Sequence, residues 1–239
     1  MIASLPSIDL LAGSGRTPWH RASALTKLLL VLGIVGLAVF TPSLRLLAAL
    51  AALALALAVS ARVPAKLVAT ALAYPSMIAL VFVVASWDGA WGPAARLLLR
   101  PTTSSLAALW LVATTPYPDL FAPISRLLPR AIGDGLFITY RALFELIGRA
   151  ERMWRSLRIR GGGRVPARQR LGAAGDGLAT LVLYAFERSQ RLYATMHLRG
   201  HSGRICGCRH YAELTRADLL VGATALAVAA MGVTLGGAS

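Results

Sequence analysis

The chain has 239 residues, and it is too apolar and too poor in charge for a soluble domain of that length. Hydrophobic residues make up 56% of it, charged residues make up 15%, and the mean hydropathy is +0.64. These values exclude an ordinary soluble globular domain and indicate an integral membrane protein. The net charge is +15, and 17 of the 25 lysines and arginines lie in residues 121–239. We therefore expect the second half to carry the cytoplasmic mass, because basic segments stay inside.

Residues 1–26 contain no cleavage-type signal peptide pattern, and we expect them to be a cytoplasmic N-terminal segment. Residues 27–116 are predicted to form a four-helix transmembrane region. The third span should kink at Tyr74-Pro75, and the fourth should be weaker, because Arg100-Pro101 and the polar residues 102–105 interrupt it. The four predicted spans are Lys27–Leu44, Leu46–Val59, Leu67–Trp87 and Leu97–Thr115.

Residues 117–216 are predicted to be a cytoplasmic region with two long amphipathic helices, separated by a break around residues 161–166. In both helices apolar residues recur at helical spacing with arginines between them, and each helix ends at a glycine. The expected apolar positions are Leu143, Leu146, Ile147, Ala150, Met153, Trp154 and Leu157 in the first helix, and Leu178, Leu181, Val182, Ala185, Ser189, Leu192 and Met196 in the second.

A last apolar run, Leu219 to Leu235, makes residues 217–239 a predicted C-terminal transmembrane helix. The sequence thus predicts an all-α integral membrane protein with about five transmembrane helices and two long amphipathic cytoplasmic helices. The number of spans remains open between four and six. The positive-inside rule places the N-terminus inside and the C-terminus outside. Arg96 and Arg100 then lie on the outer side, where only snorkelling to the interface accounts for them.

Both amphipathic helices end on an arginine followed by a glycine, at Arg160-Gly161 and Arg199-Gly200. One explanation is structural, since a basic residue is favourable at the negative end of a helix and glycine is a common helix stop. The other is functional, with each arginine projecting from a helix end into an acidic groove of a partner. The duplication favours the functional explanation. Nearly all of the positive charge is guanidinium, which pairs well with carboxylate or phosphate, so acidic partners are expected.

Four stretches, considered together, resemble a known family over about Trp19 to Gly232. They are Leu25–Leu28, Thr114–Pro116, Arg141–Glu145 leading to Ile159–Gly161, and Phe186–Gly200. The chain is similar to the transmembrane T component of energy-coupling factor (ECF) transporters, most closely the cobalt-type CbiQ family. It departs from the family signature at Ile159 and Leu198, which stand where a small residue is usual before each arginine.

The resemblance implies a non-catalytic, multi-pass scaffold in the cell inner membrane that carries motion from a pair of CbiO-like ABC ATPases to a CbiM-like substrate-binding S component. Cobalt would be the cargo, although nickel or a vitamin such as biotin could be served by a similar scaffold. The two amphipathic helices would be the coupling helices that dock onto the ATPases. The residues expected to dock are Arg160, Gly161, Arg199 and Gly200, together with Arg158, Glu187 and Arg191.

Other chemistry has weak support in the sequence. His201, Cys206, Cys208 and His210 lie close together, but Cys-x-Cys is not the spacing of a common structural zinc site, so no metal site is expected. We also predict no cofactor, no catalytic residues and no nucleic-acid partner. A hypothesis from another class remains: a membrane-anchored basic protein that binds anionic lipid or nucleic acid, with affinity that falls as salt rises.

Overall fold

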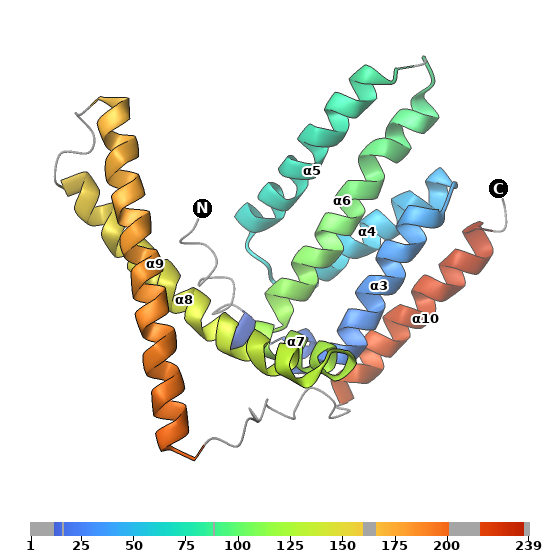
Figure 1. The fold of residues 1–239 in the computed structure, drawn as a ribbon. Coiled ribbons are helices and arrows are strands. Elements are labelled where there is room, and N and C mark those ends of the chain that lie inside the picture. Colours follow the sequence, from blue (N-terminus) through green and yellow to red (C-terminus); the bar gives the residue numbers. More distant parts are fainter. Residues whose placement is uncertain (1–11, 16, 88, 160–165, 201–215, 237–239) are drawn as a thin grey trace. The chain divides into compact units, whose positions relative to one another are not determined.

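The computed structural model describes residues 12–15, 17–87, 89–159, 166–200 and 216–236, and it is shown in Figure 1. The regular secondary structure in these ranges is α-helical throughout. The chain divides into two compact units. We call Ile8–Pro123 with Cys208–Ser239 the membrane unit, and we call the unit that contains Ile124–Gly207 the α8–α9 unit.

The membrane unit is a bundle of apolar helices around α6, which packs against α3, α4 and α5, while α10 packs against α3 and α4. Its core is made of aliphatic side chains around Trp110, which is fully buried. The helices are α2 (Pro18–Arg21), α3 (Ala24–Phe40), α4 (Leu44–Ser60), α5 (Ala65–Ala85), α6 (Trp91–Thr114) and α10 (Arg216–Gly236), and α7 (Tyr117–Leu127) begins in this unit.

Three helices in the described ranges are long and apolar enough to cross a membrane: Ala65–Ala85, Trp91–Thr114 and Ala217–Thr234. The two shorter apolar helices, α3 and α4, have 17 residues each, at the lower end of the range for a membrane span. Each predicted apolar stretch therefore corresponds to a helix. The predicted all-α membrane fold is confirmed.

The interruption expected in the fourth span does not occur, since α6 continues through Pro101 and the polar residues after it. Pro101 removes one backbone N–H donor. The hydroxyls that follow return to the helix backbone, because Thr103 donates to the carbonyl of Leu99 at 2.7 Å and Ser104 to that of Arg100 at 3.0 Å. Polar side chains that bond to their own helix are tolerated in an apolar environment.

Arg96 and Arg100, which the sequence left without a partner, bond to the turn between α3 and α4. Arg96 donates from Nη1 to the carbonyl of Pro42 at 3.2 Å, and Arg100 donates from Nη2 to the carbonyl of Thr41 at 3.0 Å. These carbonyls lie beyond the end of α3, where the helix itself supplies no donor. The two arginines therefore satisfy backbone groups of the turn.

A buried polar cluster joins α3 to α10 and α6. The Oδ1 atom of Asp218 accepts hydrogen bonds from the Ser23 backbone N–H at 2.7 Å and from the Thr26 hydroxyl at 2.8 Å. Because Ser23 is the N-cap of α3 and makes no side-chain cap of its own, Asp218 caps this helix from α10. On the other side, the 1% exposed Lys27 donates from Nζ to the carbonyl of Thr114 at 3.0 Å, at the end of α6.

The Asp218 cap yields a prediction about stability. Replacing Asp218 by alanine removes the carboxylate that accepts from the Ser23 N–H and leaves the Thr26 hydroxyl with only the Ser23 carbonyl as acceptor, and should lower the free energy of unfolding by about 1.5–3 kcal/mol. Thermal unfolding of the purified protein in detergent measures the loss. Asp176→Ala, at an exposed position on α9, is the matched control. Equal melting temperatures for the two variants would contradict the capping role.

The α8–α9 unit is built on two long helices, α8 (Arg130–Ile159, 30 residues) and α9 (Ala167–Leu198, 32 residues). Both amphipathic helices predicted from the sequence are present. Most of their expected apolar positions are partly buried, but five, Leu143, Trp154, Leu178, Val182 and Ser189, are exposed. The buried stripe on each helix is therefore narrower than the sequence pattern indicated.

Candidate functional site

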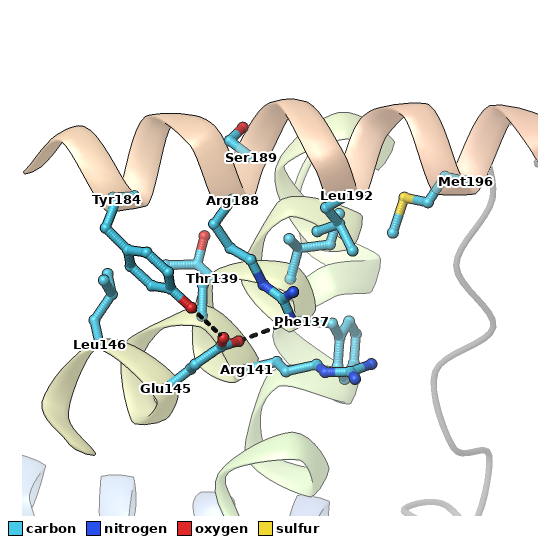
Figure 2. A pocket seen from close by; sticks show the side chains of 13 residues that line it. Phe137, Thr139, Arg141, Glu145, Leu146, Tyr184, Arg188, Ser189, Leu192 and Met196 are labelled. Atoms are coloured by element: carbon cyan, nitrogen blue, oxygen red, sulfur yellow. Dashed lines mark hydrogen bonds and ion pairs between the residues drawn. The ribbon is translucent and has the colours of Figure 1, made fainter. Parts of the chain in front are cut away.

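The two long helices are joined at one carboxylate, Glu145 of α8. Its Oε1 atom accepts a hydrogen bond from the Tyr184 hydroxyl of α9 at 2.8 Å, and its Oε2 atom lies 3.0 Å from Nη2 of Arg188 (Figure 2). The guanidinium of Arg149 lies 3.6 Å from the centre of the Tyr184 ring, in a cation–π contact. We call Glu145, Arg149, Tyr184 and Arg188 the Glu145 junction.

The Glu145 carboxylate is held in its ionised form. The hydrogen bond from Tyr184 lowers the pKa of Glu145, and the charge and hydrogen bond of Arg188 lower it further. A carboxyl group whose pKa is lowered by folding contributes its stabilisation fully above its ordinary pKa, and loses it as the pH falls through the lowered value. The Glu145 junction should therefore persist at neutral pH and weaken only in acid.

A second contact between α8 and α9 involves Gly177. A Cβ atom at this position would lie 2.7 Å from Sδ of Met153 and 3.0 Å from its Cε. The absence of a side chain at Gly177 thus lets the Met153 side chain of α8 approach the backbone of α9. The Met153–Gly177 contact lies two turns from Glu145 along α8.

The second Arg-Gly end has the geometry of a helix stop. The Arg199 N–H bonds to the carbonyls of Thr195 and Met196, both at 3.2 Å, and Gly200 takes a φ of +69°, which glycine adopts without strain. The helix stop predicted at Gly200 is confirmed. Arg160 and Gly161, the first Arg-Gly end, lie outside the described residues.

Each helix ends on an exposed apolar side chain directly before its arginine. Ile159 is 79% exposed and Leu198 is 88% exposed, as free helix ends would leave them. A large aliphatic side chain that is exposed beside a guanidinium can enter a partner's groove while the arginine pairs with an acidic group. The two residues that depart from the family signature therefore supply an apolar tip to each helix.

The two tips are far apart. Ile159 is eight peptide steps from Ala167, a stretch that can reach at most about 29 Å. Leu198 is at the other end of α9, whose 32 residues span about 48 Å. The tips must therefore be separated by at least roughly 18 Å.

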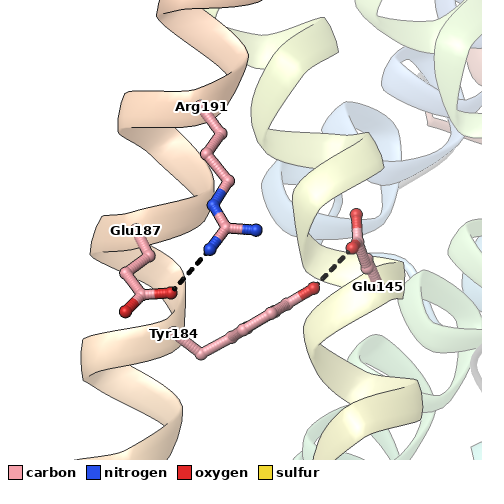
Figure 3. Close-up of polar contacts among 4 residues, drawn as sticks. All are labelled: Glu145, Tyr184, Glu187 and Arg191. Atoms are coloured by element: carbon pink, nitrogen blue, oxygen red, sulfur yellow. Dashed lines mark hydrogen bonds and ion pairs between the residues drawn. The ribbon is translucent and has the colours of Figure 1, made fainter.

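The other residues expected to dock lie along the helices. Arg158 is exposed in the last turn of α8. Glu187 and Arg191 pair with each other at 3.4 Å along one exposed side of α9 (Figure 3). They precede Arg199 by twelve and eight residues, which corresponds to roughly 18 and 12 Å along the helix axis. The structure thus places Arg158 near a tip, whereas Glu187 and Arg191 lie on the shaft of α9.

Sequence reasoning missed the role of Tyr184. A signal was present, because this tyrosine lies beside Ala185 in the predicted apolar stripe of α9, where a phenolic hydroxyl needs a polar partner. The predicted stripe of α8 contains Leu146, next to Glu145. No pattern in the sequence could pair Glu145 with Tyr184, since their register depends on where the two helices cross.

The cysteine and histidine cluster at His201, Cys206, Cys208 and His210 lies outside the described residues. Within the described ranges, no group of three or more histidine, cysteine, aspartate or glutamate side chains is arranged to hold a metal ion.

Comparison with known protein families identifies a match over most of the chain. The family model of the cobalt transport protein CbiQ matches residues 15–207. The matched range includes α2 to α9 and therefore the Glu145 junction and both Arg-Gly ends, while α10 follows it. No curated protein matches the chain.

Replacing Glu145 by glutamine should loosen the pairing of α8 with α9, because the amide has no charge to hold Arg188 and is a weaker acceptor for the Tyr184 hydroxyl. Hydrogen–deuterium exchange at neutral pH should become faster in α9 around residue 184. Glu187→Gln, which removes an exposed carboxylate bonded within α9, should leave exchange in α8 unchanged. A Glu145→Gln variant with the exchange pattern of the unmodified protein would show that the junction does not hold the helices.

Proposed function

The chain belongs to the CbiQ family of cobalt transport proteins, and we propose that it is the energy-coupling T component of an ECF-type ABC importer. The observation that carries this proposal is the pair of exposed apolar tips, Ile159 and Leu198, each followed by an arginine at the end of a long helix. Because the tips are at least roughly 18 Å apart, they can reach two separate subunits. A pair of ABC ATPases provides two equivalent grooves.

The proposed mechanism is mechanical. When ATP closes the two ATPases, their grooves move, and the arginine-tipped ends of α8 and α9 move with them. The Glu145 junction converts movement of the ends into a change in how the two helices cross. The chain itself hydrolyses no ATP in this scheme, and the partner ATPases, which are CbiO-like, supply the chemistry.

The contact at each tip combines two kinds of interaction. The aliphatic side chain of Leu198 would be buried in the groove, and the guanidinium of Arg199 would pair with an acidic group there; Ile159 and Arg160 would do the same in the other ATPase. Removing one partner of a desolvated ion pair costs about 3–5 kcal/mol. The tips are therefore the positions most sensitive to charge reversal.

The S component, CbiM-like in this proposal, would contact the membrane helices. Among these, α5 has the surface best suited to such a contact, since Ala79 is its one buried residue. Large exposed apolar side chains occupy its second half, from Tyr74 to Val84; they include Met77, Ile78, Val81, Phe82 and Val84. Lipid and a neighbouring membrane subunit can both cover such a surface.

We place the protein in the cell inner membrane as a multi-pass subunit, with residues 1–26 and 117–216 on the cytoplasmic side. The five apolar helices, α3 to α6 and α10, would be its spans. Cobalt ions would be the cargo and would be captured by the S component, so nickel or a vitamin remains an alternative cargo for the same scaffold. The family description, cobalt transport protein, favours cobalt.

Reversing the charge at both tips tests the docking. The double variant Arg160→Glu with Arg199→Glu should insert into the membrane normally but lose co-purification of the ATPases, because each groove would then meet a like charge. The matched control is Arg152→Glu with Arg168→Glu, which makes the same charge change at exposed arginines about two turns before Arg160 in α8 and at the opposite end of α9 from Arg199. The ATPases should remain with the control.

Two results would contradict the proposal. Retention of both ATPases and full uptake by the tip variant would show that the arginines do not dock. An equal loss of partners in the tip and control variants, reproduced by moderate salt alone, would instead indicate an additive basic surface that binds anionic lipid or nucleic acid.

A further inference from the structure

A groove of about 520 Å³ runs between α8 and α9 beside the Glu145 junction. This volume lies within the range of small-molecule sites. Its lining is predominantly apolar, and α8 and α9 each supply half of the aliphatic side chains: Ile138, Ala142 and Leu146 from α8, and Ala185, Leu192 and Met196 from α9. The groove contains neither of the tips proposed to dock the ATPases.

Two guanidinium groups enter this apolar groove. Arg141 of α8 and Arg188 of α9 both direct their side chains into the space between the helices, as Figure 2 shows. Glu145 is the one carboxylate in the lining, and its two oxygens are taken by Tyr184 and Arg188. Among the described residues, Arg141 makes no hydrogen bond or ion pair. The lining therefore has one positive charge in excess, on a side chain available to a ligand.

This combination defines the chemistry of a ligand. The guanidinium groups suit a single phosphate, because they form paired hydrogen bonds with its oxygens. The aliphatic walls suit a hydrocarbon chain, because burying it removes apolar surface from water. A nucleotide fits poorly, since the groove has no glycine-rich loop and no lysine for a polyphosphate. An anionic phospholipid has both required parts, a phosphate and a hydrocarbon chain.

We propose that the groove between α8 and α9 binds one anionic phospholipid, with its phosphate at Arg141 and Arg188 and an acyl chain along Ile138, Leu192 and Met196. The lipid contacts both helices, so it reinforces the Glu145 junction and stiffens the crossing. This inference does not depend on the docking of ATPases. It makes the mechanical link between the two helix ends sensitive to the lipid composition of the membrane.

The test measures the lipid retained by the purified chain. The protein is equilibrated in detergent micelles containing equal amounts of dioleoyl phosphatidylglycerol, which is anionic, and dioleoyl phosphatidylcholine, which is zwitterionic, and bound lipid is counted by native mass spectrometry. The unmodified protein should keep one phosphatidylglycerol in preference to phosphatidylcholine. Arg141→Gln should weaken that preference about fivefold, the effect of one arginine beside an anionic lipid.

Arg155→Gln is the matched control, because it removes an equal charge from another exposed arginine of α8. It should keep the preference of the unmodified protein. A second variant, Ala185→Phe, fills the groove without changing charge and should abolish retention of the lipid. Its thermal unfolding is compared with that of the unmodified protein to confirm that it folds.

Three outcomes would overturn the proposal. Equal weakening by Arg141→Gln and Arg155→Gln would mean that lipid follows the net charge of the protein and not the groove. Displacement of the lipid by millimolar inorganic phosphate would mean that the site recognises phosphate without a chain. Retention of lipid by a folded Ala185→Phe variant would place the lipid elsewhere.

Discussion

The architecture of the α8–α9 unit depends on the interactions that Glu145 makes across the two helices. Each helix is about 45–48 Å long; most residues of α9 are exposed, including large apolar ones, whereas most residues of α8 are partly buried. Isolated helices of this kind would cross at no fixed angle. Glu145 fixes the crossing because its two oxygens bond to Tyr184 and Arg188 of α9, while Arg149 packs on the same tyrosine ring.

The Glu145 junction sets the register of α8 and α9 but contributes little to the free energy of folding. The side chains of Arg188 and Glu145 are 45% and 34% exposed, so water and salt screen their attraction. An ion pair of this kind contributes little to stability, and its value lies in selecting one register of the two helices. A crossing held in this way can change angle at modest cost. This property suits helices that transmit movement.

In the membrane unit, polar side chains join the helices by bonding to backbone groups of other segments. Several of its polar contacts are buried or partly buried, and they serve backbone groups that would otherwise lack partners in a medium without water. Asp218 caps α3, Lys27 bonds to the end of α6, and Arg100 bonds to the turn after α3. Each of these contacts joins segments far apart in the sequence. They join the membrane helices to one another, whereas α8 and α9 are joined by the partly exposed Glu145 junction and the Met153–Gly177 contact.

The sequence predicted the membrane helices well, because their apolar runs are long and their ends are marked by polar or turn-forming residues. It failed at Pro101, where the pattern suggested a break but α6 continues. The Glu145 junction and the Asp218 cap could not be predicted, since each depends on tertiary packing. The Arg-Gly ends were visible in the sequence, but their separation and the exposure of Leu198 required the structure.

Site-specific photo-crosslinking from the two tips tests the central claim most directly. A photoreactive amino acid would replace Ile159 or Leu198 in the assembled transporter, and in a control it would replace Leu183, which is exposed on the shaft of α9. The account predicts that both tip positions crosslink to an ATPase subunit and that position 183 does not. Crosslinks from the tips to lipid alone, with none to an ATPase, would contradict it.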